Sequence, residues 1–436
     1  MTLFISTINV IAILGFAFLM ERKQGSAVRS FFWPAFAIKL LAGIGLGWVY
    51  QRYYLTGDTF VFFDQANVQA HVFKSRAGAY LDFLWRDPPI DIEWKGAARS
   101  VFFVKMVSIF AIVADGNYWI TSLWFSFVSF LASFYLFKLV ARYFEGATAA
   151  ASLAFLFFPS VVFWGSGVIK ESIGLAALMV LSGVYLKVMM KRVPGLAEIG
   201  LATIGLWVVW NLKYYWMAVF LPVVCTSLAV QAVSSRLAIP SRLKVSGWTI
   251  LFFILCLGVS LLHPNFYPER ILQVVIENNQ AFAAHSDPDD LIHYGILEPT
   301  WESVIVHAPW ALVSGLFRPF LWEADSLLKF AVALENGLIL VLCLSSFGRI
   351  GDFLRSQNRV ITLSVMVYVF LLCVFLALST PNLGSLARYK VGFLPFLVFL
   401  LTYKNPLIRY VLLSPLVERV KKWFTKSVIA DQQSVD

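Results

Sequence analysis

Two acidic side chains directly follow a long apolar run, where a carboxylate would meet water at the mouth of a membrane bundle. Asp58 lies in the stretch Thr56–Asp64, and Asp64 ends that stretch after several aromatic residues. A carboxylate in such a position can act as a general base toward an acceptor hydroxyl. The alternative is that Asp58 caps a helix beginning near Thr59, a common role for Asp. We predict Asp58 and Asp64 as catalytic candidates.

Charged residues that suit a phosphate occur in two further polar segments. Lys170 and Glu171 stand between two apolar runs, and ionisable groups at such a boundary are usually functional or paired. Arg318 is flanked by aromatic residues, and its planar guanidinium matches two phosphate oxygens. The alternative for Arg318 is a simple ion pair with Glu323. We predict that Lys170, Glu171, Arg318 and Glu323 contribute to substrate binding.

The last predicted external turn, residues 381–390, carries two cations close to each other. Arg388 and Lys390 would stand at the outer end of a helix, whose free backbone N–H groups also attract an anion. The segment contains Asn382 and Tyr389 as well. We predict that these four residues bind a phosphate or pyrophosphate; anchoring at the membrane surface is the alternative.

No metal ligand set is evident from the spacing of histidine, cysteine and acidic residues. None of the five histidines stands at HxxxH spacing, and the four cysteines lie inside apolar runs without a CxxC pair. We therefore predict no metal site and no required cofactor. A divalent ion held by Asp58 or Asp64 together with a substrate phosphate stays open as an alternative.

The chain that carries these segments has the composition of a polytopic membrane protein. Of its 436 residues 59% are hydrophobic and 14% charged, with a mean hydropathy of +0.76. We predict an all-α helical bundle in which about eleven apolar runs approach the length needed to cross about 30 Å of hydrocarbon. These runs are residues 2–20, 31–50, 118–140, 147–166, 172–190, 196–212, 214–232, 247–262, 327–347, 360–380 and 391–403.

The run from Val101 to Ala114 is too short to cross comfortably and carries Lys105 in its middle. We predict a helix that lies along the outer membrane surface. It belongs to the first of two large external segments, residues 51–117 and 263–326. Such external juxtamembrane helices would cover the mouth of the bundle.

The basic residues predict the orientation of the chain. With the N-terminus outside and the C-terminus inside, every predicted inner segment is basic. These segments hold Arg22, Lys23 and Arg29; Lys138 and Arg142; Lys187, Lys191 and Arg192; Arg236, Arg242 and Lys244; Arg349, Arg355 and Arg359; and Lys404 to Lys426 in the tail. The net charge of +10 therefore indicates orientation and membrane lipid contact, not nucleic acid. We predict a bundle of residues 1–403, a basic cytoplasmic tail of residues 404–436, and a multi-pass protein of the inner (plasma) membrane.

The chain resembles bacterial members of the GT-C superfamily of integral-membrane glycosyltransferases. Three features carry the resemblance: Asp58 early in the first external segment, the surface helix followed by Gly116-Asn117-Tyr118, and the stretch from Asn382 to Pro395 with its Arg-Tyr-Lys. The resemblance implies sugar transfer from a polyprenyl-phosphate donor to a lipid, glycan or protein acceptor on the outer face. It also implies that Asp58 is the catalytic base, although Thr59 stands where that family often has a second acid.

The charges fit such a reaction, because Arg318, Arg388 and Lys390 would stabilise a departing phosphate. Two other hypotheses stay open. One is a polysaccharide polymerase or ligase whose catalytic groups lie in residues 263–326. The other is a non-catalytic lipid-glycan transporter or assembly subunit. A transporter would carry charges deep in several spans, whereas this chain has few, so the sequence favours an enzyme.

Overall fold

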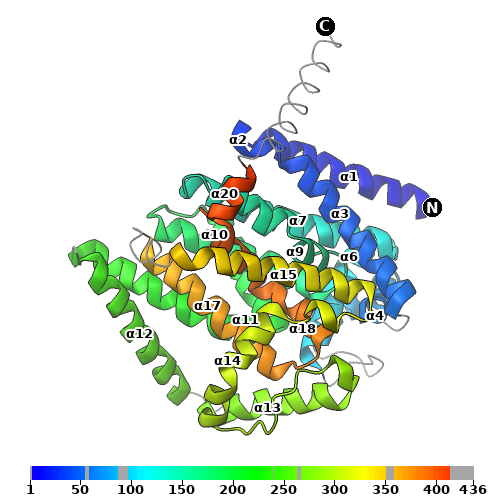
Figure 1. The fold of residues 1–436 in the computed structure, drawn as a ribbon. Coiled ribbons are helices and arrows are strands. Elements are labelled where there is room, and N and C mark those ends of the chain that lie inside the picture. The colour runs from blue at the N-terminus through cyan, green and yellow to red at the C-terminus, as the bar shows by residue number, and fades with distance from the viewer. Residues whose placement is uncertain are drawn as a thin grey trace.

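The computed structural model describes residues 2–54, 58–86, 97–237, 239–262, 267–349 and 358–412. Within these ranges the regular structure is helical, and the β-pairing consists of one isolated bridge between Leu291 and Asn382. The predicted all-α class is confirmed. Figure 1 shows α1 along one edge of the bundle and α13 at the opposite edge.

The first half of the chain forms α1 (Thr2–Arg22), α2 (Ser26–Arg29), α3 (Phe32–Val49), the π-helical turn η1 (Tyr50–Tyr54), α4 (Asp58–Ser75), α5 (Ala77–Trp85), α6 (Ala98–Val113), α7 (Tyr118–Tyr143), α8 (Thr148–Ser152), η2 (Leu153–Phe157), α9 (Pro159–Trp164) and α10 (Lys170–Met189). The second half forms α11 (Leu196–Leu237), α12 (Ser241–Leu262), α13 (Pro268–Ala284), η4 (Pro288–Asp290), α14 (Trp301–Phe317), η5 (Leu321–Glu323), α15 (Leu327–Ser346), η6 (Phe347–Arg349), α17 (Arg359–Ser379), α18 (Leu383–Tyr389), η7 (Lys390–Gly392), α19 (Leu394–Thr402) and α20 (Pro406–Leu412).

Seven of the described helices are long and apolar enough to cross a membrane, and the count is eight if the bent pair formed by residues 383–392 and 394–402 is one span. The bend in that pair is 69°. The chain is therefore a polytopic membrane protein, as its composition indicates. The predicted number of eleven crossings, and the predicted placement of the two termini, stay predictions.

Helix α11 turns back on itself at Lys213, where the backbone leaves helical geometry (φ −141°, ψ 55°). At one end of α10, Lys187 pairs with Glu198 and the Met189 carbonyl accepts a hydrogen bond from Gln231. At the other end of α10, Glu171 pairs with Lys213. Both ends of α11 thus lie beside the same end of α10, so its two arms run antiparallel. This agrees with the separate predicted runs 196–212 and 214–232.

The predicted run 147–166 is interrupted in the structure. Helix α8 passes into the π-helical η2, the chain breaks before Pro159, and α9 ends at Trp164. The segment that joins α9 to α10 is buried, because Ser166 and Val168 are both 0% exposed. The segment packs against α7, where Ser126 Oγ accepts a hydrogen bond from the Gly167 N–H at 3.0 Å. The backbone of Gly167 has a positive φ of +71°.

A helix, α6, forms where the surface helix is predicted, and it packs mainly against α4 with further contacts to α7 and α11. Its position along the membrane surface stays a prediction. Helices α4 and α6 share a cluster of buried side chains that includes Phe62, Phe103 and Val107. Between α6 and α7 the chain turns through Gly116 (φ +72°). Asn117 then caps α7, because its side-chain oxygen accepts hydrogen bonds from the N–H groups of Trp119 and Ile120.

Replacing Asn117 with Ala is expected to lower the stability of the protein by about 1 kcal/mol, since the first turn of α7 loses its acceptor. Thermal unfolding in detergent measures the loss. Asn117→Asp is the matched control, because Asp keeps the acceptor oxygen and should stay close to wild type. Equal losses in the two variants would contradict the capping role.

The second predicted external segment contains α13, α14 and several turns. Helix α14 packs closely on α17, and Cys373 Sγ lies 3.9 Å from the Leu312 carbonyl oxygen. At the other end of the bundle the buried Asn405 bonds to Ser345 and Ser346 of α15. Asn405, the second residue of the predicted tail, is therefore packed against α15, and residues 413–436 of that tail lie outside the described ranges.

Candidate functional site

Arg388 of α18 brings together three parts of the chain that are far apart in sequence. Its Nη1 lies 3.6 Å from Asp58 Oδ2 of α4 and donates to the Tyr50 hydroxyl at 3.1 Å. Its Nε lies 3.4 Å from Glu171 Oε1 of α10. Nη2 donates to the hydroxyl of Tyr389 at 3.4 Å. The guanidinium therefore stands at the centre of a cluster that we call the Arg388 cluster: Tyr50, Asp58, Glu171, Lys213, Arg388 and Tyr389.

The deepest part of the Arg388 cluster is an ion pair between Glu171 and Lys213. Lys213 Nζ lies 2.6 Å from Glu171 Oε1, and the two side chains are 5% and 3% exposed. The ammonium also lies 4.3 Å from the centroid of the Tyr389 ring. Charges removed from water to this extent persist only when each is closely compensated. Within the cluster, the negative charges of Asp58 and Glu171 balance the positive charges of Lys213 and Arg388.

Exposure increases steadily from the buried pair toward Asp58. The side chain of Glu171 is 3% exposed, that of Arg388 18% and that of Asp58 51%. Asp58 is the first residue of α4, and among the described residues its ion-pair partner is Arg388, with weaker electrostatic interactions with Lys170 and Tyr50. The capping alternative for Asp58 thus has no hydrogen bond to support it in the described residues. Asp58 is the open end of the cluster, where a substrate can reach it.

The neighbouring Thr59 holds the start of α4 in place. Its hydroxyl donates to the Val168 carbonyl at 2.7 Å and lies 2.9 Å from the hydroxyl of Tyr118. The Thr59 side chain is completely buried. The Asp58 carboxylate is therefore attached to a rigid helix start, beside the buried segment that leads into Glu171.

The guanidinium of Arg388 is incompletely satisfied. Its Nε is buried and makes no hydrogen bond of normal geometry, although it faces Glu171. Buried polar groups are usually hydrogen-bonded, so an exception calls for an explanation. Nε faces Glu171, whereas Nη1 faces the half-exposed Asp58. An anion that replaced Asp58 could therefore bind at the Nη1 end of the guanidinium, whose planar shape suits a phosphate or a carboxylate.

Lys170 and Asp64 make no described hydrogen bond or ion pair with the Arg388 cluster, although Lys170 is close enough to interact electrostatically with its charged groups. Lys170 Nζ donates to Ser100 Oγ of α6 at 2.8 Å and lies 4.4 Å from the centroid of the Phe62 ring. Asp64 is six residues after Asp58, which turns it about 240° around the helix to another face. It is exposed and has no described partner, and partial burial raises the pKa of its carboxyl. The structure does not bring Asp64 to Arg388.

Arg318, Glu323 and Lys390 form a separate network, in which Lys390 is buried and the side chains of Arg318 and Glu323 are partly exposed. Arg318 engages Glu323 with two nitrogens, at 2.5 Å for Nη2 to Oε1 and 3.1 Å for Nε to Oε2. Lys390 Nζ donates to the Arg318 carbonyl at 2.7 Å and to Asn336 Oδ1 at 3.3 Å. Both cations are thus committed to internal partners. Their predicted roles in phosphate binding receive no support from this geometry, which fits the ion-pair alternative for Arg318.

The described hydrogen bonds of Asn382 are with the chain itself. Its side-chain oxygen accepts from the Ser385 N–H at 2.8 Å and thereby caps α18, and its nitrogen donates to Ser286 Oγ at 3.0 Å. The cap fixes the start of the short helix that ends in Arg388 and Tyr389. Asn382 therefore ties the cluster to the segment after α13.

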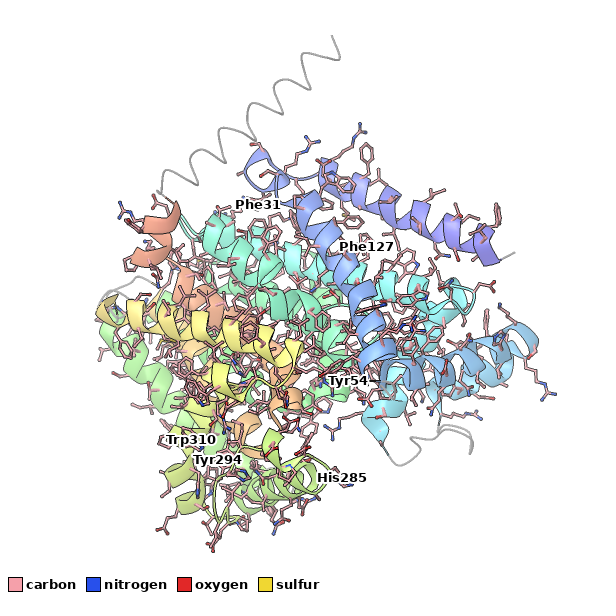
Figure 2. The ribbon with its side chains drawn as sticks, turned by 45° about the vertical axis from the view of Figure 1, so that its right-hand side comes forward. Phe31, Tyr54, Phe127, His285, Tyr294 and Trp310 are labelled. Carbon is pink, nitrogen blue, oxygen red and sulfur yellow. The ribbon has the colours of Figure 1, made fainter. Side chains whose placement is uncertain are left out.

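Charged residues from the second half of the chain, Asp290 and Lys329, lie close enough to Tyr54 to interact with it electrostatically. Lys329 pairs with Asp290 and Asp325, and its hydrogen bond lowers the pKa of the Asp325 carboxyl. Figure 2 shows Tyr54 at the end of the α3 ribbon, and His285 in the part of the molecule below it. Among the described residues no three His, Cys, Asp or Glu side chains are grouped to hold a metal ion.

Two members of the Arg388 cluster were not predicted from the sequence. The sequence could have pointed to Lys213 as a site residue, because it is a lone cation at the break between two apolar runs. It could not have pointed to Tyr50, since an aromatic residue at the end of a span is typical of the membrane interface. Comparison of the chain with protein-family models, with curated proteins and with solved structures finds no match. Function must therefore be argued from the geometry.

Proposed function

We propose that this chain is a membrane glycosyltransferase that moves a sugar from a polyprenyl-phosphate donor to a lipid, glycan or protein acceptor. The observation that carries the proposal is the half-exposed Asp58 carboxylate next to the incompletely satisfied guanidinium of Arg388. A base and an anion-binding group are the two functions that this transfer requires. Both stand at one end of an apolar bundle that can hold the lipid part of the donor.

In the proposed reaction the phosphate of the donor binds to the N–H groups of Arg388 and displaces Asp58 from it. Asp58 then accepts the proton of the acceptor hydroxyl while the hydroxyl oxygen bonds to the sugar carbon. The bond between that carbon and the phosphate oxygen breaks, and its electron pair leaves with the phosphate. Arg388 stabilises the charge that develops there. Glu171 and Lys213 hold the guanidinium in position, and no metal or cofactor is assigned a step.

The charge distribution supports placing Asp58 on the outer face. Arg142, Lys187, Lys191 and Arg192 gather at the end of α7 and α10 that lies away from Glu171. Basic residues beside spans favour the cytoplasmic side. The proposed orientation puts the Arg388 cluster outside, where a lipid-linked sugar would serve as donor, and suits the plasma membrane.

The test compares two arginines in donor binding and sugar transfer. Arg388→Gln should weaken donor binding about 10- to 100-fold, the usual effect of losing hydrogen bonds to a charged group. Arg318→Gln serves as the control, because Arg318 is a similarly exposed arginine that already has its partner in Glu323. It should leave donor affinity unchanged in the folded fraction, measured with a labelled polyprenyl-phosphate sugar in liposomes.

A larger loss of transfer for Arg318→Gln than for Arg388→Gln would contradict the proposed site and favour the polymerase or ligase hypothesis. Donor binding that needs Arg388 without any transfer would favour the transporter or assembly hypothesis.

A further inference from the structure

Two charged side chains inside the bundle do not belong to the Arg388 cluster. Lys39 of α3 is 3% exposed, and Glu335 of α15 is partly buried. Ionisable groups within membrane spans are rare and usually functional or paired. The hydrogen bonds that the structure shows for both lead to the same short helix, α9, which Figure 1 shows in the interior of the bundle.

Glu335 binds the beginning of α9. Its Oε1 accepts a hydrogen bond from the Ser160 N–H at 2.9 Å. Pro159, the first residue of α9, has no N–H, so the Ser160 N–H is the first donor inside this helix. Such a group has no partner within the helix, and a carboxylate suits the positive charge at this end. Glu335 of α15 therefore supplies the acceptor that the start of α9 lacks.

Lys39 binds the other end of the same helix. Its Nζ donates to the Val161 carbonyl at 3.3 Å, and this carbonyl also accepts from the Gly165 N–H at 3.2 Å. A Cβ at Gly165 would lie 2.6 Å from Lys39 Nζ, so glycine is needed for this approach. Ser129 of α7 donates to the Gly165 carbonyl at 2.6 Å. Side chains of α3, α7 and α15 thus hold α9 at both ends.

The position of α9 determines the position of two carboxylates of the Arg388 cluster. Residues 165–169 join α9 to α10, and Glu171 is in the first turn of α10. Within the joining segment the Val168 carbonyl accepts from Thr59, which follows Asp58. A displaced α9 would therefore move both Glu171 and the start of α4. Misplacement of reacting groups by about 1 Å can slow a reaction about a hundredfold.

We propose that Glu335 and Lys39 are positioning residues, which hold α9 in place and thereby keep Asp58 and Glu171 beside Arg388. Both act on backbone groups of the chain and not on a substrate. This role gives a reason for two charges that the transfer reaction itself does not use. Their effect on sugar transfer rests on the proposed function, whereas their effect on α9 does not.

The first experiment measures amide hydrogen exchange of residues 160–171 by mass spectrometry, with the full chain in detergent. Glu335→Leu should speed this exchange about 10- to 100-fold, the usual effect of losing a hydrogen bond to a charged group. Glu335→Gln keeps an acceptor oxygen and should stay close to wild type. Lys39→Met should speed exchange at the other end of α9. Ser129→Ala removes a neutral hydrogen bond there, so it should fold normally and speed exchange about fivefold.

The second experiment measures single-turnover sugar transfer by the same variants. Glu335→Leu should slow transfer about tenfold or more through misplaced groups, and Glu335→Gln should restore the rate. Glu198→Leu is the matched control, because Glu198 joins α11 to Lys187 at the end of α10 away from Glu171. In its folded fraction, exchange of residues 160–171 and transfer should match wild type.

Three results would overturn the proposal. One is unchanged exchange of residues 160–171 in the Glu335→Leu, Lys39→Met and Ser129→Ala variants. Another is an equal increase in Glu198→Leu, and the third is an effect of Glu335→Gln as large as that of Glu335→Leu. If exchange changes as expected but the wild type transfers no sugar, the role of both residues in holding α9 is supported and only the proposed function is contradicted.

Discussion

Asp58→Asn should slow sugar transfer by about a hundredfold or more while donor binding is retained, because general-base catalysis usually contributes between about 10² and 10⁴ in rate. Asn has nearly the same shape but cannot take the proton of the acceptor hydroxyl. Asp58 is half exposed and its described partner is Arg388, so the substitution should leave the fold intact. Single-turnover transfer in liposomes measures the rate, and titration with labelled donor measures binding.

The matched control is Asp64→Asn, six residues further along the same helix. Asp64 has no described partner, and partial burial raises the pKa of its carboxyl. Removing a charge that burial disfavours should cost neither stability nor activity. Equal rates for wild type and Asp58→Asn would show that Asp58 is not the base. An equal loss in both variants would point to the charge of α4 as a whole, and not to the contact with Arg388.

Glu171→Gln should destabilise the protein by about 3–5 kcal/mol, the usual cost of removing one partner from a buried ion pair. The side chain is 3% exposed and faces two cations, with Lys213 Nζ at 2.6 Å and Arg388 Nε at 3.4 Å. The substitution would leave both cations without their shared carboxylate. Thermal or denaturant unfolding of the purified protein in detergent measures the loss.

The double variant Glu171→Gln with Lys213→Met separates a charge effect from a packing effect. Removing one of the two uncompensated cations should recover a large part of the lost stability, since apolar replacement of a buried pair is often neutral. If the double variant were no more stable than Glu171→Gln alone, the pair would not be the source of the loss. The buried part of the Arg388 cluster would then have to be described differently.

Much of the fold could be predicted from the distribution of apolar residues. The all-α class, the helix at residues 98–113 and the turn at Lys213 follow from run length and from breaks in hydrophobicity. The interruption between α8 and α9 did not, because a broken apolar run has the same composition as a continuous one. The burial of residues 165–169 depends on Ser126 and Gly43 of other helices, and a local pattern contains no information about such partners.

The candidate site, too, could be predicted only in part from the sequence. Asp58, Glu171, Arg388 and Tyr389 were identified by residue type, and the structure brings them together. Lys390 and Arg318 are also cations in polar segments between apolar runs. Their side chains, however, already bond to Asn336 and Glu323, respectively. Residue type and position along the chain show which side chains can bind phosphate. Which of them is left with spare hydrogen-bonding capacity depends on tertiary contacts.

The central claim is that this chain transfers sugar from a polyprenyl-phosphate donor, and one measurement tests it most directly. Purified wild-type protein is reconstituted in liposomes and supplied with a radiolabelled pool of polyprenyl-phosphate sugars and candidate acceptors. The account predicts that label leaves the donor pool and appears in an acceptor, and that Asp58→Asn in the same preparation abolishes most of this transfer. If no label moves from any donor while the donors still bind, the protein is not this enzyme.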